Sequence, residues 1–237
     1  MTVRRLALLI ATSMLTLGAG PPERVDVLIR GCTVYTGLDA PFVGDVAISG
    51  DRIRAVGRRL TLPARRVVDA RGMIVAPGFI DPHTHLTEQL LSDDARTRLV
   101  AAFLMQGVTT VFIGNDGGGD PDLKRVLGSA AEKPVGINYA AYVGLGPIRK
   151  QVIGDADRAP TVDELARMKH LVANAMCDGA LGLSTGLFYA PQSFARTDEV
   201  VALAREAGVR GGTYDSHLRD ESSYSIGLGA AVDEAIE

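Results

Sequence analysis

The sequence predicts an α/β fold in which a parallel (β/α) barrel follows a small β unit, and three observations support this. Residues 25–69 contain short runs of alternating apolar and polar residues, which are typical of antiparallel strands. After residue 85, apolar strand-like runs alternate with helical segments, which indicates a parallel sheet covered by helices. Side chains that can bind a metal ion follow three of these strands. Such strand ends meet on one face of a barrel. A doubly wound sheet would instead require a glycine-rich phosphate turn, and residues 117–119 match that turn only weakly, so the barrel is favoured.

The composition is that of a folded protein with no tendency to bind nucleic acid. Apolar residues make up 46% of the chain, and the net charge of −3 includes no long block of one sign. Cys32 and Cys177 are too few for a disulfide framework, and we expect both to be buried thiols.

Residues 1–20 have the pattern of a secretory signal peptide. Arg4 and Arg5 precede an apolar run from residue 6 to residue 17, and small residues at 18–20 suit cleavage. The apolar run is too short to span a bilayer comfortably. We therefore expect export to a periplasm or beyond, with no membrane association after cleavage. A buried N-terminal helix is the alternative.

Residues 21–75 are expected to form an antiparallel β unit that is too small to be a complete sandwich. Residues 49–52 provide a hairpin turn between two of its strands. No helical segment separates the strands, so neighbours in sequence should pair with one another. The expected strands are residues 25–30, 45–48, 52–56 and 66–69.

Residues 76–237 are expected to supply five strand–helix units of a barrel. The first strand is the apolar run that includes residues 73–76 and 79–80, and we expect it to be buried. The helix over residues 161–176 has the clearest start, because Thr161 and Glu164 form a capping box. The other expected strands are residues 108–113, 135–143, 180–184 and 212–216, and the other expected helices are residues 92–106, 120–131, 197–207 and a last one that begins near residue 226.

Two histidines, His83 and His85, follow the first strand of the barrel and are candidate metal ligands. Alternate side chains of a strand share a face, so the two imidazoles should point the same way. Neutral imidazoles are good ligands for zinc. An ordinary pair of loop histidines is the alternative, but the chain has only four histidines and two of them lie together at a strand end.

Two further strand ends supply groups that can bind a metal. Asp116 follows the second barrel strand and His217 ends the fifth. Three histidines and one carboxylate can hold a zinc ion, and an aspartate can also bridge two ions. Each residue has an alternative role, because Asn-Asp-Gly around Asp116 is typical of a turn and a lone histidine is commonly a hydrogen-bonded core residue. His170 is expected to be a structural residue on the apolar stripe of a helix.

Three polar residues surround His217 in the sequence. Asp215 should point away from Ser216 on the strand, and we expect it to face the helices. Arg219 is close enough to Asp220 to form a local ion pair. The alternative is that Arg219 orients a substrate.

Three motifs resemble a known family. Residues 76–85, Ala-Pro-Gly-Phe-Ile-Asp-Pro-His-Thr-His, resemble the first barrel strand of the amidohydrolase superfamily. The β unit before them resembles the part of a small β-sandwich that the N-terminus of this superfamily supplies. Residues 179–187, followed by Tyr189 and Pro191, and residues 214–221 resemble the N-acyl-D-amino-acid deacylase (D-aminoacylase) group of that superfamily.

The resemblance implies a metal-dependent barrel hydrolase that cleaves the amide bond of an N-acyl-D-amino acid, a small-molecule substrate, with one or two zinc ions. His83 and His85 would bind one ion and His217 the other. The family has a bridging cysteine where this chain has Asp116, and a carboxylate is a harder and less selective ligand than a thiolate. Tyr189 would donate a hydrogen bond to the developing oxyanion.

The chain is expected to be the N-terminal part of a longer enzyme and to be inactive, or nearly so, alone. A complete barrel needs eight units and about 250 residues. The resemblance places a fourth metal-binding histidine on the sixth strand and the general base, an aspartate, on the eighth strand. Both would lie beyond Glu237.

Two other functions stay open from the sequence. A cyclic-amide hydrolase or dipeptidase of the same superfamily would usually carry a metal-bridging carboxylated lysine on the fourth strand, and residues 179–189 contain no lysine. The other alternative is an exported metal-binding protein without catalytic activity.

Overall fold

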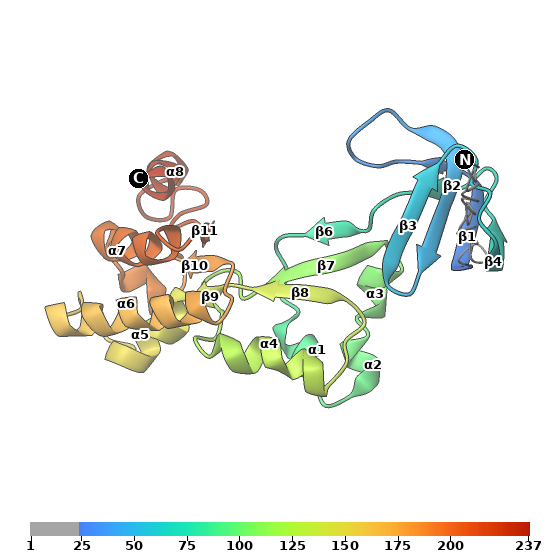
Figure 1. The fold of residues 1–237 in the computed structure, drawn as a ribbon. Helices are drawn as coiled ribbons and strands as arrows, with labels where there is room; N and C mark the ends of the chain where they lie inside the picture. Colours follow the sequence, from blue (N-terminus) through green and yellow to red (C-terminus); the bar gives the residue numbers. More distant parts are fainter. Residues whose placement is uncertain (1–23) are drawn as a thin grey trace, which may run out of the picture. The chain divides into compact units, whose positions relative to one another are not determined.

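A computed structural model describes residues 24–237, and these form two compact units that divide after Pro77 (Figure 1). The expected signal peptide, residues 1–20, lies outside the described residues. Within residues 24–237, no helix combines the length and the apolar character needed to cross a bilayer. Each unit is described separately.

The N-terminal unit is a β-sheet built around its first strand. β1 and β2 pair antiparallel, as do β2 and β3, which confirms the expected hairpins. β4 and β5 instead pair parallel to β1, so the expectation of a wholly antiparallel unit is wrong. The reason is topological, because residues 58–63 carry the chain from one edge of the sheet to the other before β4 begins. The strands are β1 (Val25–Val34), β2 (Phe42–Ser49), β3 (Arg52–Gly57), β4 (Ala64–Asp69) and β5 (Ile74–Val75).

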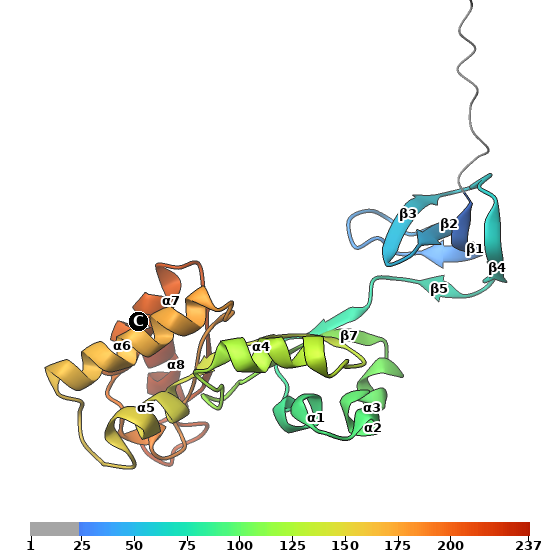
Figure 2. The ribbon, with the colours of Figure 1, turned by 60° about the horizontal axis from the view of Figure 1, so that its bottom comes forward.

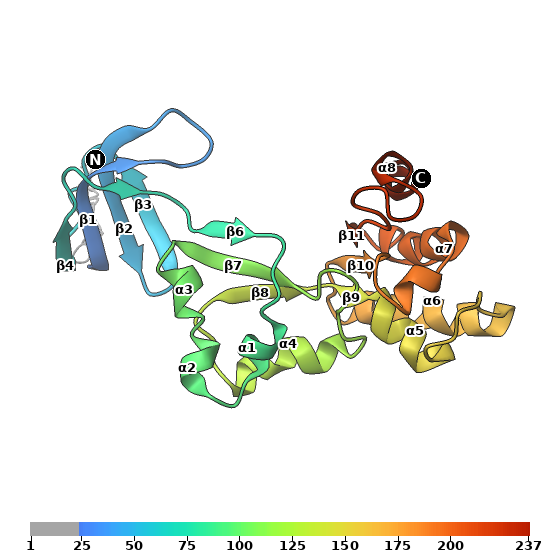
Figure 3. The same cartoon turned by 180° about the vertical axis from the view of Figure 1, so that it is seen from behind.

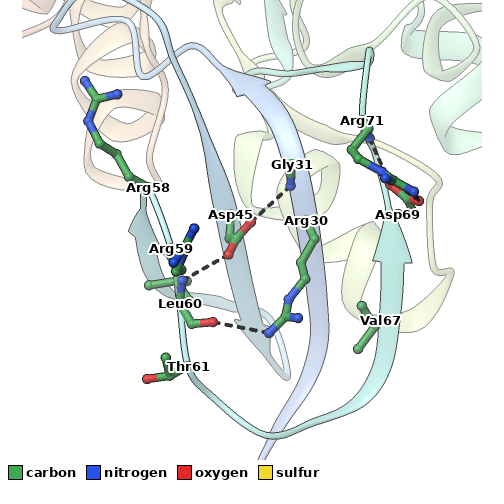
Figure 4. Close-up of a pocket in the computed structure, with 10 residues that line it drawn as sticks. All are labelled: Arg30, Gly31, Asp45, Arg58, Arg59, Leu60, Thr61, Val67, Asp69 and Arg71. Atoms are coloured by element: carbon green, nitrogen blue, oxygen red, sulfur yellow. Dashed lines mark hydrogen bonds and ion pairs between the residues drawn. The ribbon is translucent and has the colours of Figure 1, made fainter.

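A hollow of about 680 Å³ lies beside the crossing segment of this unit (Figure 4). Asp45 is buried there and accepts the N–H groups of Gly31 and Leu60 at 3.0 and 2.9 Å. Although burial opposes the shift, these bonds and the nearby charge of Arg30 lower the pKa of Asp45. Arg30 also donates to the Leu60 carbonyl at 3.3 Å. The polar groups of the hollow therefore hold residues 58–63, the segment that crosses the sheet, against β1 and β2.

The second unit contains two three-stranded parallel sheets, as a partial barrel requires (Figure 3). One sheet has the order β6-β7-β8, and the other has the order β9-β10-β11. β8 and β9 together cover most of the strand expected over residues 135–143, which is interrupted at Tyr142. Five strand positions therefore follow one another in chain order. The strands are β6 (Phe79–Asp81), β7 (Val108–Ile113), β8 (Asn138–Ala141), β9 (Val143–Gly144), β10 (Gly182–Gly186) and β11 (Thr213–His217).

The first barrel strand differs from the expectation. The run that was expected to be one strand is divided between the units, with β5 in the N-terminal sheet and β6 in the barrel. Gly78 separates them where a Cβ would lie only 2.0 Å from the Thr109 hydroxyl. Phe79 and Ile80 are 64% and 62% exposed, so β6 is not the buried strand that its apolar residues predict. Within residues 24–237 it pairs with β7 alone, so its other edge has no strand partner there.

Helices cover the parallel strands, and α6 packs against both α5 and α7 (Figure 2). Thr161 and Glu164 form the expected capping box at the start of α6. Its buried side chains are Met168, Val172 and Ala175, whereas His170 is exposed and the prediction that it lies on the apolar stripe is wrong. The longer helices are α4 (Leu123–Glu132), α5 (Leu145–Ile153), which the sequence analysis missed, α6 (Val162–Cys177), α7 (Thr197–Gly208) and α8 (Leu228–Ile236).

The two cysteines differ in their surroundings. Cys32 is fully buried in β1, as expected, and its thiol donates to the Gly44 carbonyl at 3.4 Å. Cys177, at the end of α6, is exposed, so the expectation of a second buried thiol is wrong. Its position at the last turn places the side chain outside the packed face of the helix.

The single long helix expected over residues 92–106 is wrong. Two short helices lie in this range, and a third precedes it. Val100 adopts a left-handed conformation with φ of 43°, which interrupts the helix. The buried guanidinium of Arg98 donates to the carbonyls of Ser92, Asp93 and Pro134, at 2.8, 2.9 and 3.2 Å. These bonds fold the segment back on itself. The helices are α1 (Thr87–Leu91), α2 (Ala95–Arg98) and α3 (Ala101–Leu104).

A buried ion pair joins two helices of the barrel unit. Arg149 in α5 is fully buried, and its Nη1 donates to both carboxylate oxygens of Glu199 in α7, at 2.5 and 2.6 Å. Its Nη2 donates to the carbonyls of Ala156 and Arg158 at 3.4 and 3.1 Å. Burial raises the pKa of the Glu199 carboxyl, and the hydrogen bonds and charge of Arg149 oppose that rise. Arg149 therefore stabilises the charged form of Glu199.

Replacing Arg149 by Met should lower the free energy of unfolding by about 3–5 kcal/mol, because the Glu199 carboxylate would remain buried without its partner. Urea unfolding followed by circular dichroism measures this loss. The double variant Arg149→Met/Glu199→Leu should recover most of it, since neither charge is then buried. An equal loss in the single and double variants would show that the pair contributes only through packing.

Candidate metal centre

His83 and His85 lie just beyond β6, in the segment that leads to α1. They are not on the strand itself, because β6 ends at Asp81, whose carboxylate accepts the N–H of His83 at 3.2 Å. Between them, Thr84 is buried and donates its N–H and hydroxyl to the Phe112 carbonyl, at 3.1 and 2.7 Å. The two imidazoles remain 46% and 68% exposed, with their centroids 5.5 Å apart. Anchoring Thr84 to β7 therefore presents both rings at the end of the sheet.

Asp116 lies in the turn after β7, as the Asn-Asp-Gly sequence suggested. Its φ of 53° is left-handed, which costs a residue with a side chain about 1–2 kcal/mol. Gln192 holds the turn by donating to the Asp116 carbonyl at 3.1 Å and accepting the N–H of Gly186 at 2.7 Å. The buried hydroxyl of Ser184 accepts the N–H of Gly117 at 3.1 Å. The turn is thus fixed to β10 and to the short helix η1 (Gln192–Phe194).

The Asp116 carboxylate contacts both histidines that follow β6. Its Oδ1 lies 3.3 Å from His83 Nε2, and its Oδ2 lies 3.3 Å from His85 Nε2. One ligand atom from each of the three residues falls within 4.8 Å of the others. Two ligands of a tetrahedral zinc ion lie about 3.3 Å apart when each bond is about 2.0–2.1 Å long. Asp116 Oδ1 is also buried and makes no hydrogen bond, so this donor set fits a divalent metal ion.

His217, at the end of β11, joins the same group through Asp116. Its Nδ1 lies 3.8 Å from Asp116 Oδ1, and its Nε2 lies 3.3 Å from Glu221 Oε1. Nε2 is buried and has no hydrogen bond. The Asp116 carboxylate, which follows β7, therefore lies among three imidazoles from the ends of β6 and β11, and the arrangement can hold one ion or two ions bridged by Asp116.

The two residues expected to contact a substrate lie in different settings. Tyr189 is 46% exposed, and its ring centroid lies 4.7 Å from that of His217, next to the centre. Arg219 forms structural contacts instead. Its guanidinium binds Glu234 at 2.8 Å and donates to the carbonyls of Ser193 and Ala195 at 3.0 and 2.8 Å. Arg219 therefore forms an ion pair with Glu234 of α8 rather than the expected one with Asp220, and its bonds give it a structural role in place of the alternative, orienting a substrate.

Asp220 organises the loop between β11 and α8. Its buried carboxylate accepts the N–H groups of Ser222, Tyr224 and Gly227, at 2.9, 3.2 and 3.0 Å, and also that of Ser225. Burial alone would raise the pKa of Asp220, but these bonds together lower it well below its usual range. Asp220 is consequently ionised at neutral pH and fixes the loop that begins beside His217.

Two further residues belong to the centre, Asp215, whose direction was wrongly predicted, and Asn115, which the sequence did not indicate. Asp215 was expected to face the helices, and this prediction is wrong. Its Oδ1 lies 3.4 Å from His83 Nδ1. It is two residues before His217 on β11, so the two-residue period of a strand already places both side chains on one face. Asn115 is buried and donates to Asp215 Oδ2 at 3.2 Å. Apart from its place in a turn, nothing in the sequence distinguishes Asn115.

Removing the charge of Asp116 should weaken metal binding more than any other single change at this turn. The variant Asp116→Asn should lower zinc affinity by about 100-fold or more, beyond the roughly 10–100-fold loss typical for a residue that only supports a ligand. The variant Asp116→Cys should keep tight binding, because a thiolate is a good zinc ligand. Competition with a chromophoric chelator measures both. Unchanged affinity in Asp116→Asn would exclude the carboxylate as a ligand.

Comparisons with known proteins agree with this geometry. The model of the Amidohydrolase family matches residues 66–210. The chain is 36% identical to a D-aminoacylase of Alcaligenes xylosoxydans xylosoxydans, over 88% of this chain and 47% of the relative. It is 37% identical to an N-acyl-D-aspartate deacylase of the same organism, over 91% of this chain and 47% of the relative. The chain therefore spans about half the length of the curated relatives it matches.

A solved structure gives the same result in three dimensions. An N-acyl-D-glutamate deacylase from Bordetella bronchiseptica, complexed with zinc and a phosphonate inhibitor, superposes with a TM-score of 0.80 and 32% sequence identity. The match covers 90% of this chain and 48% of that one. The parallel strands of residues 78–237 are accordingly part of a (β/α) barrel, with the histidines and Asp116 at its strand ends. The chain belongs to the amidohydrolase family.

Proposed function

We propose that this chain supplies the metal-binding part of a zinc-dependent hydrolase of N-acyl-D-amino acids. The reaction cleaves a linear amide bond and releases a carboxylate and a D-amino acid. One observation carries the proposal, which is the convergence of His83, His85 and His217 on the Asp116 carboxylate at the ends of parallel strands. The three relatives described above, a D-aminoacylase, an N-acyl-D-aspartate deacylase and an N-acyl-D-glutamate deacylase, supply the substrate class.

The residues of this chain have distinct roles in such a reaction. A bound zinc ion would act as a Lewis acid and lower the pKa of water enough for hydrolysis at neutral pH. His83 and His85 would hold one ion, His217 would hold the second, and Asp116 would bridge the two. Tyr189, beside His217, would donate its hydroxyl proton in a hydrogen bond to the oxygen that gains charge on the substrate amide.

The structural residues around the centre would keep these groups in position. Gln192 and Ser184 fix the Asp116 turn to β10. Arg219 binds Glu234 of α8 and two carbonyls near η1, and Asp220 orders the following loop. These contacts hold His217 and Tyr189 without themselves touching a substrate.

Hydrolysis of N-acetyl-D-methionine by the purified, zinc-loaded chain tests the proposal, with the L-enantiomer and a hydantoin as competing substrates. Because this chain spans about half the length of its relatives, we expect bound zinc that is lost in His83→Ala, with little or no release of D-methionine by the chain alone. Release of D-methionine but not of L-methionine would show that the chain suffices for the reaction, and preference for the hydantoin would favour a cyclic-amide hydrolase. Zinc binding without turnover, also after the chain is extended by any coding sequence that follows it, would favour a non-catalytic metal-binding protein.

We further propose that the protein acts in a periplasm or outside the cell. The proposal rests on residues 1–20, in which Arg4 and Arg5 precede an apolar run and small residues. Expression in a bacterium with fractionation and N-terminal sequencing tests it. A mature protein that starts near residue 21 in the periplasmic fraction is expected, and a full-length protein confined to the cytoplasm would contradict export.

A further inference from the structure

The imidazole of His83 lies between two carboxylates, one at each ring nitrogen. Nε2 faces Asp116 Oδ1 at 3.3 Å, and Nδ1 faces Asp215 Oδ1 at 3.4 Å. Asp116 and Asp215 come from different strands, β7 and β11, and both carboxylates are largely buried. The position of the single ring proton on neutral His83 therefore determines which nitrogen keeps a lone pair for a metal ion.

The hydrogen bonds of Asn115 favour one position for that proton. The side-chain oxygen of Asn115 accepts the N–H of Thr84 at 3.3 Å, which fixes the orientation of the amide. Its Nδ2 lies 3.2 Å from the Pro82 carbonyl, 3.2 Å from Asp215 Oδ2 and 3.3 Å from His83 Nδ1. An amide nitrogen carries only two hydrogens, and the two oxygens take both.

Asn115 therefore already donates to two oxygens. His83 Nδ1 lies 3.4 Å from Asp215 Oδ1, which is an acceptor, so a proton on Nδ1 would satisfy both groups. Asp215 would then accept from His83 through one oxygen and from Asn115 through the other. With the proton on Nδ1, His83 Nε2 keeps its lone pair on the side that faces Asp116.

We propose that Asp215 is a positioning residue that holds His83 in the Nδ1-protonated tautomer and so prepares Nε2 to bind the metal ion. A carboxylate that accepts from the second ring nitrogen of a histidine ligand orients the ring and raises its basicity. Asp215 acts through His83 and does not itself contact the metal ion or the substrate. The inference deepens the proposed metal site and rests on it.

Two measurements on the full chain test the role of Asp215. In the metal-free protein, ¹⁵N NMR of the imidazole nitrogens, assigned with His83→Gln, should show His83 protonated at Nδ1. Asp215→Ala should shift this population toward the Nε2-protonated form and lower zinc affinity by about 10–100-fold. Asp215→Asn, which retains the volume and one acceptor oxygen, should show a smaller change in both measurements.

The variant Asp163→Asn is the matched control, because it removes an exposed carboxylate from the first turn of α6. It should leave the tautomer and the zinc affinity unchanged. His83 protonated at Nε2 in the unaltered chain, or an unchanged tautomer and affinity in Asp215→Ala and Asp215→Asn, would overturn the proposal. If the unaltered chain bound no zinc, the metal site would be wrong, and the tautomer measurement would still decide the role of Asp215.

Discussion

The centre depends on the left-handed turn that carries Asp116. The turn places one carboxylate among imidazoles that come from β6 and β11, which belong to different three-stranded sheets. A side chain at this φ is strained, so the conformation needs external support. Ser184 and Gln192 provide it by bonding the backbone on both sides of the turn. The site is therefore built by polar contacts between strands as much as by the ligands themselves.

The distribution of unsatisfied polar atoms points to the same place. Buried polar groups cost free energy unless they are hydrogen-bonded, and proteins leave few of them without a partner. Among residues 24–237, four buried side-chain atoms have no hydrogen bond, and two of them are Asp116 Oδ1 and His217 Nε2. The supporting residues Ser184, Gln192 and Asn115 are buried as well, yet each is hydrogen-bonded. Incomplete bonding at the centre is the state expected of groups whose partner is an ion.

Strand periodicity and strand order predicted the centre better than they predicted the surrounding fold. His83, His85, Asp116 and His217 could be grouped from the sequence because the ends of parallel strands meet on one face. Asp215 could have been added, since it is two residues from His217 on the same strand. Its direction relative to Ser216 alone does not show which of the two side chains faces the centre.

The remaining differences come from tertiary contacts that a local pattern does not contain. The helix over residues 92–106 has suitable residues, but the buried Arg98 and the left-handed Val100 divide it. The direction of β4 depends on residues 58–63 crossing the sheet, which strand propensity does not determine. In contrast, the start of α6 was predicted, because its capping box involves only residues three apart. Structure that depends on residues close in sequence can be predicted from the sequence. Contacts between strands can be predicted only where the strand order already shows which residues meet.

The charges around the centre suit a carboxylate at Asp116, the position where the resemblance implies a cysteine. Three carboxylates, from Asp116, Asp215 and Glu221, lie within 4 Å of imidazole nitrogens. Neutral imidazoles do not offset this negative charge, so the group favours a divalent cation over an empty site. With Asp116 as the shared ligand, the donors are nitrogen and oxygen only, and preference for zinc over a harder ion rests on the three histidines. Control of the histidine tautomers therefore matters more here than in a site where a thiolate supplies the selectivity.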